Sequence, residues 1–264
     1  MRSSTRYRLD ELSRDPVMVS LVLSSIVLLN VAFWSTGVFE ASALSLSLKY
    51  KYQLFWSALL SVTELIPPFV AMYLGLKALG PSLATGQYYI ELAHAKRKES
   101  VYDSYLKVVW AIALFYVVVI SLNGLALHLV SKLPVDASDF LAWCLSTLFS
   151  FGVYCSVGFL ASVLFYGWSG LILCLGFFIM VNIVQSSNIP FVNITVSLPH
   201  AVREVGMFLF PSFWPSIEAL RDETRAPSWI PFIFRMGVPV QVYQAVWIGG
   251  ITLLARHIAG KKDY

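Results

Sequence analysis

The stretch FLAWCLSTLFSFGVYCSVGFLASVLFYGWSGLILCLGFFIM, residues Phe140–Met180, contains no charged residue, and the uncharged run continues to Val202. A bilayer core takes roughly 20 helical residues to cross, so this stretch is long enough for two membrane crossings. Inside lipid each backbone amide must be bonded within its own segment, and both crossings are therefore expected to be helices. The predicted fold class is an all-α integral membrane protein.

Four further apolar stretches of membrane length accompany this pair. We predict six transmembrane helices: Val17–Phe39, Leu54–Leu76, Val108–Val130, Phe140–Tyr166, Trp168–Val184 and Met236–Leu254. Only 13% of the residues are charged, against about 25% in soluble proteins. Residues 1–264 are expected to form a single transmembrane domain. A mixed-charge segment precedes the first span, which does not fit a signal peptide.

The distribution of Lys and Arg predicts the orientation of the chain. Basic residues concentrate before the first span, around the loop after the second and behind the sixth: Arg2, Arg6, Arg8, Arg14, Lys77, Lys96, Arg97, Lys98, Lys107, Arg256, Lys261 and Lys262. Because short basic loops stay in the cytoplasm, we expect a multi-pass protein of the cell membrane with both termini cytoplasmic. This bias accounts for most of the net charge of +4, and no nucleic-acid partner is expected.

The connection between spans two and three, residues 80–107, is long and basic. Gly80 and Pro81 are expected to end the second span, and Ser82 or Thr85 to cap a new helix. Aromatic and apolar residues then recur at helical spacing, which predicts a short amphipathic helix at the cytoplasmic surface. Its basic run 96–98 either meets anionic lipid headgroups or belongs to a docking helix for a soluble partner.

The connection between spans five and six, residues 185–235, combines large apolar residues, prolines and charges. Such a segment fits a re-entrant helical hairpin that dips into the outer leaflet. Within it, Asn193 begins an Asn-Ile-Thr triplet, a possible glycosylation site. The cysteines Cys144, Cys155 and Cys174 lie in predicted spans, so neither a disulfide nor a metal site is expected.

Glu64 is the one acidic residue well inside a predicted span. It stands just before Pro67 and Pro68, which are expected to bend or break the helix. An ionisable group at that depth is costly, which makes these three residues a candidate translocation or gating site. The alternative is a structural hydrogen bond from Glu64 to a polar partner; the candidates are Asn30, Asn123 and Gln244.

A set of short motifs between Leu65 and Val108 resembles a known family. The motifs are Ile66-Pro67, Leu74-Gly75, Thr85-Gly86, Ile90-Glu91-Leu92, Ala95-Lys96-Arg97-Lys98 and Leu106-Lys107. In this order the chain is similar to the permease subunits of type-2 ABC exporters, the six-span type V class. It departs from the usual family pattern at Ser82, Gln87 and Ala95, where Glu, Thr and Pro are common.

The resemblance implies an N-terminal elbow segment (1–16) and a coupling helix that docks in an ATPase. The residues carried over to that coupling role are Tyr88, Tyr89, Ile90, Glu91, Leu92, His94, Lys96, Arg97, Lys98 and Glu99. The implied partners are two copies of a cytoplasmic ABC ATPase, a second permease copy in a homodimer or related heterodimer, and membrane lipids. The chain has no P-loop motif, so ATP and Mg are expected on the ATPase, with no cofactor or catalytic residue here.

Three other functions stay open from the sequence. A secondary transporter would use Glu64 as its intramembrane site. An intramembrane serine protease would use Ser169 within Gly167-Trp168-Ser169-Gly170, a rhomboid-like motif, and would need a histidine base such as His257. A receptor-like or scaffold protein would assemble without a nucleotide-dependent partner. Recovery of a stoichiometric P-loop ATPase with the chain separates these functions from the exporter.

Overall fold

The computed structural model describes residues 2–37, 48–63, 65–95, 99–132, 137–165, 168–186, 188–189, 194–195, 199, 202, 205–206 and 240–261. The helices, in chain order, are α1 (Arg2–Ser13), α2 (Pro16–Ser35), α4 (Leu48–Thr63), α5 (Ile66–Ala84), α6 (Gln87–His94), α7 (Glu99–Ser131), α8 (Ala137–Leu164), α9 (Trp168–Ser186) and α13 (Val240–Lys261). Two short strands, β1 (Asn188–Ile189) and β2 (Ile194–Thr195), lie between α9 and α13.

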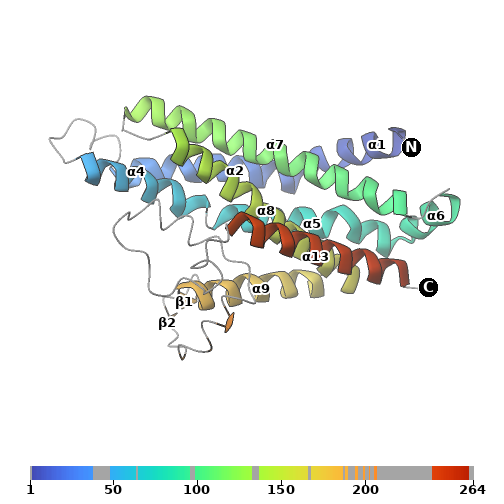
Figure 1. Ribbon diagram of the computed structural model, residues 1–264. Helices are drawn as coiled ribbons and strands as arrows, with labels where there is room; N and C mark the ends of the chain where they lie inside the picture. Colours follow the sequence, from blue (N-terminus) through green and yellow to red (C-terminus); the bar gives the residue numbers. More distant parts are fainter. Residues whose placement is uncertain are drawn as a thin grey trace.

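The long helices run side by side as an elongated bundle, and both chain termini lie at the same end as α6 (Figure 1). Helix α8 is the centre of the packing, because it contacts α5, α7, α9 and α13. Its sequence is apolar around most of its circumference, as expected for a helix surrounded by other helices. Large buried side chains such as Trp143, Phe151 and Phe159 fill the space around it.

Helices α5 and α8 form the most extensive contact in the described part of the chain. Gly75 of α5 and Gly158 of α8 face each other there with no space for a side chain. A Cβ on Gly75 would overlap the carbonyl oxygen of Cys155 and lie 2.8 Å from the amide nitrogen of Phe159. A Cβ on Gly158 would lie 3.1 Å from Cα of Gly75. Paired glycines thus let two helix backbones touch, a common device in membrane bundles.

Three described segments have the length and hydropathy needed to cross a membrane: Pro16–Ser35, Val101–Ser131 and Trp143–Leu164. The apolar part of α9, Trp168–Val184, is shorter. Outward faces of these helices carry exposed Leu, Val, Ile and Phe side chains, for example Val27 and Phe115. Water disfavours contiguous apolar surface of this kind, whereas lipid accommodates it. These features fit an all-α protein embedded in a membrane.

The second predicted span, Leu54–Leu76, is two helices instead of one. Helix α4 ends at Thr63 and α5 begins at Ile66, so the helix is interrupted near the prolines, as predicted. Pro67 and Pro68 occupy the first turn of α5, where a missing backbone N–H costs no hydrogen bond. The predicted end at Gly80 and Pro81 is wrong: α5 continues to Ala84, because one proline near the last turn removes only one hydrogen bond.

Two further helix boundaries differ from the prediction, and the connection between spans two and three is shorter than residues 80–107. Helix α7 starts at Glu99 instead of Val108. The apolar and aromatic residues just before Val108 form the first turns of this helix, where Val101, Tyr102 and Tyr105 are buried in the bundle. Helix α13 continues past the predicted end at Leu254 to Lys261. Ala255 and Ala259 are buried in this extension, so packing sustains it beyond the apolar stretch.

The outer segment 185–235 falls mostly outside the described residues. Near its start the chain is extended, with β1 and β2 pairing antiparallel and Asn188 opposite Thr195; the aromatic stretches on which the helical hairpin was predicted lie outside the described residues. Ile189 and Ile194 are β-branched residues that favour this extended conformation. Asn193 lies outside the described residues, directly before β2.

Candidate functional site

Helix α6 forms a short amphipathic element at the end of the bundle that also holds both termini (Figure 1). Gly86 precedes it with φ +73°, a left-handed conformation that glycine adopts without strain. The expected cap at Ser82 or Thr85 is wrong: the Thr85 hydroxyl donates instead to the carbonyl oxygen of Pro81 at 2.9 Å. The helix ends at His94, so Glu99 belongs to α7 and not to the predicted coupling helix.

The two faces of α6 differ in their surroundings. Tyr88 is buried and its ring packs on Tyr105 of α7, with 5.9 Å between the ring centroids. Burial raises the pKa of Tyr88, and the charge of Arg256 partly opposes that rise. On the outward face Ile90 is 62% exposed and His94 is exposed beside it. The outward face of α6 thus presents one large apolar side chain and one imidazole at the surface of the bundle.

Arg8 of α1 joins three helices at one point. Its Nη2 donates to Glu91 of α6 in an ion pair, and its guanidinium lies 3.3 Å from the ring centroid of Tyr105. The Gln87 side chain also donates to Glu91, at 3.2 Å. The side chains of Arg8 and Glu91 are 8% and 26% exposed. Burial lowers the pKa of Arg8, while Tyr105 and Glu11 oppose that shift.

A second polar cluster joins α2 to α5. Asp15 caps α2 by accepting from the amide of Val17 at 2.9 Å, and it also accepts from the Tyr73 hydroxyl at 3.2 Å. Lys77 Nζ lies 3.3 Å from the other carboxylate oxygen. Burial alone would raise the pKa of Asp15, but the Val17 amide and Lys77 outweigh it, so the pKa is lowered. Asp15 is therefore held as a carboxylate.

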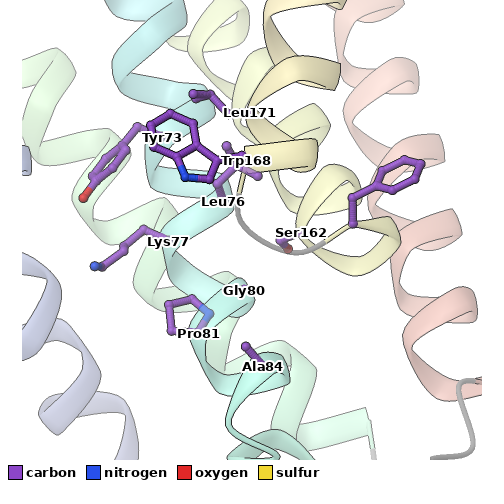
Figure 2. A pocket seen from close by; sticks show the side chains of 10 residues that line it. Tyr73, Leu76, Lys77, Gly80, Pro81, Ala84, Ser162, Trp168 and Leu171 are labelled. Atoms are coloured by element: carbon purple, nitrogen blue, oxygen red, sulfur yellow. The ribbon is translucent and has the colours of Figure 1, made fainter.

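Two cavities flank α5 near these clusters. A polar cavity of about 260 Å³ lies between α1, α5 and the loop before α6; its lining includes Arg8, Glu11, Asp15, Lys77 and Ser82. An apolar cavity of about 370 Å³ lies between α5, the end of α8 and the start of α9. Figure 2 shows it, with Trp168 and Leu171 beside α5.

The other predicted site residues do not form a common site in the described part of the chain. Glu64, the basic run 96–98 and Asn193 lie outside the described residues. Asn30 and Asn123, two possible partners of Glu64, hydrogen-bond each other at 3.3 Å. Ser169 is exposed at the start of α9, and in the described part of the chain no histidine hydrogen-bonds to it. Cys155 and Cys174 are buried, unpaired thiols.

The sequence alone gives no site role to six side chains of the two clusters: Arg8, Gln87 and Tyr105 in the first, and Asp15, Tyr73 and Lys77 in the second. The sequence does signal Asp15, because Asp before Pro at the start of an apolar run is a typical helix N-cap. The pairing of Arg8 with Glu91, 83 residues apart, has no local signal. Comparison with protein-family models and with curated proteins finds no match for this chain.

Proposed function

We propose that this chain is the membrane-spanning subunit of an ATP-driven exporter, in which α6 contacts a separate ATPase subunit. The observation that carries the proposal is the way in which α6 is attached to the bundle. This helix is fixed to α1 through Arg8 and to α7 through Tyr105, while Ile90 and His94 face outward. A short helix held rigidly at the end of a bundle, with a free outer face, suits the transfer of a partner's movement to the spans.

In this proposal α2, the interrupted pair α4–α5, α7, α8, α9 and α13 are the six spans. The end with both termini and α6 faces the cytoplasm. The distribution of charge supports this orientation, because basic residues gather towards that end: Arg14, Lys77, Lys107, Arg256 and Lys261. ATP and Mg would be bound by two ATPase subunits, and a second permease copy would complete the translocation path.

The proposed mechanism is rigid-body coupling. Closure of the ATPase pair on nucleotide would displace α6, and the buried Arg8–Glu91 pair would pass that displacement to α1. The ring contact between Tyr88 and Tyr105 would pass it to α7. Packed helices move as discrete bodies and not by continuous deformation, so a small displacement at α6 would change the arrangement of whole spans.

The test begins with purification of the chain from its own membranes in mild detergents, followed by identification of what is recovered with it. We expect a P-loop ATPase in near-equal amount. Ile90→Glu should reduce that recovery at least tenfold, because it places a charge on the outward face of α6. Ser13→Glu puts the same charge on an exposed position of α1 and should leave recovery unchanged. Absence of any ATPase in several detergents would refute the exporter, and full recovery with Ile90→Glu would refute docking through α6.

The interrupted helix favours a second candidate, a secondary transporter. Discontinuous spans that place polar groups near the bilayer midplane are typical of such proteins. Helix α4 ends at Thr63 and α5 begins at Ile66, with Glu64 between them in the sequence, and the buried Thr63 hydroxyl accepts from the Trp143 indole N–H at 3.4 Å. A transporter of this kind would move its cargo on an ion gradient without an ATPase. Glu64→Gln should then abolish gradient-driven uptake, whereas an exporter with a structural Glu64 would retain ATP-driven transport.

A further inference from the structure

The two cavities beside α5 adjoin each other, because Lys77 and Pro81 line both. The larger is apolar, about 370 Å³, with Leu76, Phe165 and Leu171 in its wall. The smaller is polar, about 260 Å³. Each volume is near the lower end of the range typical of small-molecule sites, about 300–1,000 Å³. An apolar and a polar cavity side by side match the two halves of an amphiphile.

The cavities lie at the level where apolar helix gives way to charged sequence. Asp15 caps the first apolar helix here, and Lys77 is the last charged residue of α5. Trp168 at the apolar cavity is 81% exposed, and tryptophan is enriched where hydrocarbon meets headgroups. Figure 2 shows Tyr73 and Lys77 extending from α5 in the same direction, towards Asp15, with which both interact.

Two cationic side chains line the polar cavity, Arg8 and Lys77. The Arg8 side chain is 8% exposed and its Nη1 is itself buried, so Arg8 contributes positive charge to the cavity and Nη1 offers no accessible donor. The Lys77 side chain is half-exposed and supplies the accessible N–H donors. Charged donors of this kind form strong hydrogen bonds with phosphate oxygens.

The charges that line the polar cavity are of both signs. Arg8 and Lys77 are positive, and Glu11 and Asp15 are negative. Asp15 is already compensated by the Val17 amide, Tyr73 and Lys77, whereas Glu11 is exposed. A ligand of net negative charge would be repelled by the carboxylates. A zwitterion, with one phosphate and one ammonium, would meet a complementary group at each end.

We propose that the paired cavities bind one phospholipid with a primary-ammonium headgroup. Part of an acyl chain occupies the apolar cavity, the phosphate accepts from the Lys77 ammonium beside the positive charge of Arg8, and the ammonium donates to Glu11. Phosphatidylcholine has the same net charge but no N–H to donate, and phosphatidylglycerol lacks the cation, so both fit less well. The site does not depend on the proposed transport function, because lipid retention requires no ATPase.

The experiment is native mass spectrometry of the full chain in detergent, titrated with dioleoyl phosphatidylethanolamine, phosphatidylcholine or phosphatidylglycerol. We expect one phosphatidylethanolamine to be retained at least tenfold more strongly than either of the others. Gly80→Leu should abolish that retention: a Cβ at residue 80 lies 3.7 Å from Ser162 Cβ, so the leucine can enter the apolar cavity without a backbone clash. Gly176→Leu is the matched control, since nothing lies within 4 Å of its Cβ position.

Two further variants test the headgroup. Glu11→Gln should reduce phosphatidylethanolamine retention to the level of phosphatidylcholine, while Asp10→Asn on the same helix should not. Ala84→Leu, at the exposed edge of the apolar cavity, replaces Gly80→Leu if that variant does not fold. Equal retention of the three lipids by the wild-type chain would refute the headgroup assignment. Absence of lipid retention by the wild-type chain, as expected for cavities filled only by water, would refute the site. Full lipid retention in both cavity-filling variants would refute it as well.

Discussion

Neutralising Glu91 tests whether α1, α6 and α7 are held together by the buried charge cluster. Glu91→Gln keeps the shape of the side chain but removes the counter-charge of Arg8, whose side chain is 8% exposed. The guanidinium also lies 3.3 Å from the Tyr105 ring centroid, so the same charge contacts both α6 and α7. The variant should therefore loosen the attachment of α1 and α6 to the bundle while leaving the central helices intact.

The magnitude follows from burial. Removing one partner of a fully buried ion pair costs about 3–5 kcal/mol, because the remaining charge is uncompensated. Glu91 is 26% exposed, so water reaches part of the pair, and Gln can still accept one hydrogen bond from Arg8. We expect about half of that range, roughly 2 kcal/mol, for local opening of α1 and α6. At 1.36 kcal/mol per tenfold change, this equals an opening population raised about 30-fold.

Amide hydrogen exchange of the detergent-purified chain measures this opening directly. Residues 2–13 and 87–94 should exchange about 30-fold faster in Glu91→Gln, with little change in α8. Arg14→Gln is the control, because it breaks the exposed pair with Asp10 on the same helix, and exposed pairs contribute about 0–1 kcal/mol. Equal exchange in the two variants would refute the idea that the Arg8–Glu91 pair fastens α1 to α6.

Three other predictions concern the bundle itself. Gly158→Ala should destabilise the chain by about 1–3 kcal/mol through overpacking against α5, and should expose the buried cysteine thiols to a maleimide dye at lower temperature, whereas Gly80→Ala should not. Asp15→Asn should remove the acid dependence of amide hydrogen exchange in α2. Because the fold lowers the pKa of Asp15 below its ordinary value of 3.8, the carboxylate stabilises the fold above pH 3.8, and this stabilisation is lost as the pH falls from 3.8 through the lowered pKa. Tyr116→Phe removes a 2.9 Å hydrogen bond to Ser25 between α7 and α2, and should cost about 0.5–1.5 kcal/mol in a thermal unfolding assay.

The helices were predictable from the sequence because membrane length and helical periodicity are local properties. The amphipathic helix observed at Gln87–His94 followed from the helical spacing of Tyr89, Leu92 and Lys96 and of Ile90, Ala93 and Arg97. Its limits did not, because they depend on Gly86, whose left-handed conformation allows the chain to turn sharply before α6. The early start of α7 also could not be read locally, since hydropathy is low around Lys107 and burial of Tyr102 and Tyr105 decides the outcome.

The site residues were harder to predict because the contacts that define them are long-range. In the sequence Arg8 stands out only as one of the basic residues that predict the membrane orientation, and nothing near it points to Glu91. The close approach of Gly75 and Gly158 likewise depends on the arrangement of α5 and α8, and the presence of a glycine in the sequence does not predict such a contact. The cap at Asp15 is an exception, because it is formed within one helical turn.

The helices at the α6 end of the bundle are joined by two kinds of contact. Helices α1, α6 and α7 are joined through Arg8 and Tyr105, and α7 is joined to α13 by the Tyr102 hydroxyl, which donates to the Thr252 carbonyl at 3.1 Å. Helices α5 and α8 are joined differently, by backbone contact at paired glycines, which permits no separation without loss of packing. A force on α6 would therefore reach α1 and α7 through side chains, and α5 through the short turn at Gly86. Helix α2 is linked to α5 at this end by Asp15, which pairs with Lys77 and accepts from Tyr73. If these two groups of contacts act separately, Lys77→Met should increase the movement of α2 relative to α5 without releasing α6, whereas Glu91→Gln should release α6 and leave α2 in place. Distance measurements between spin labels on α2, α5 and α6 distinguish the two outcomes, and equal effects of both variants at both positions would contradict that separation.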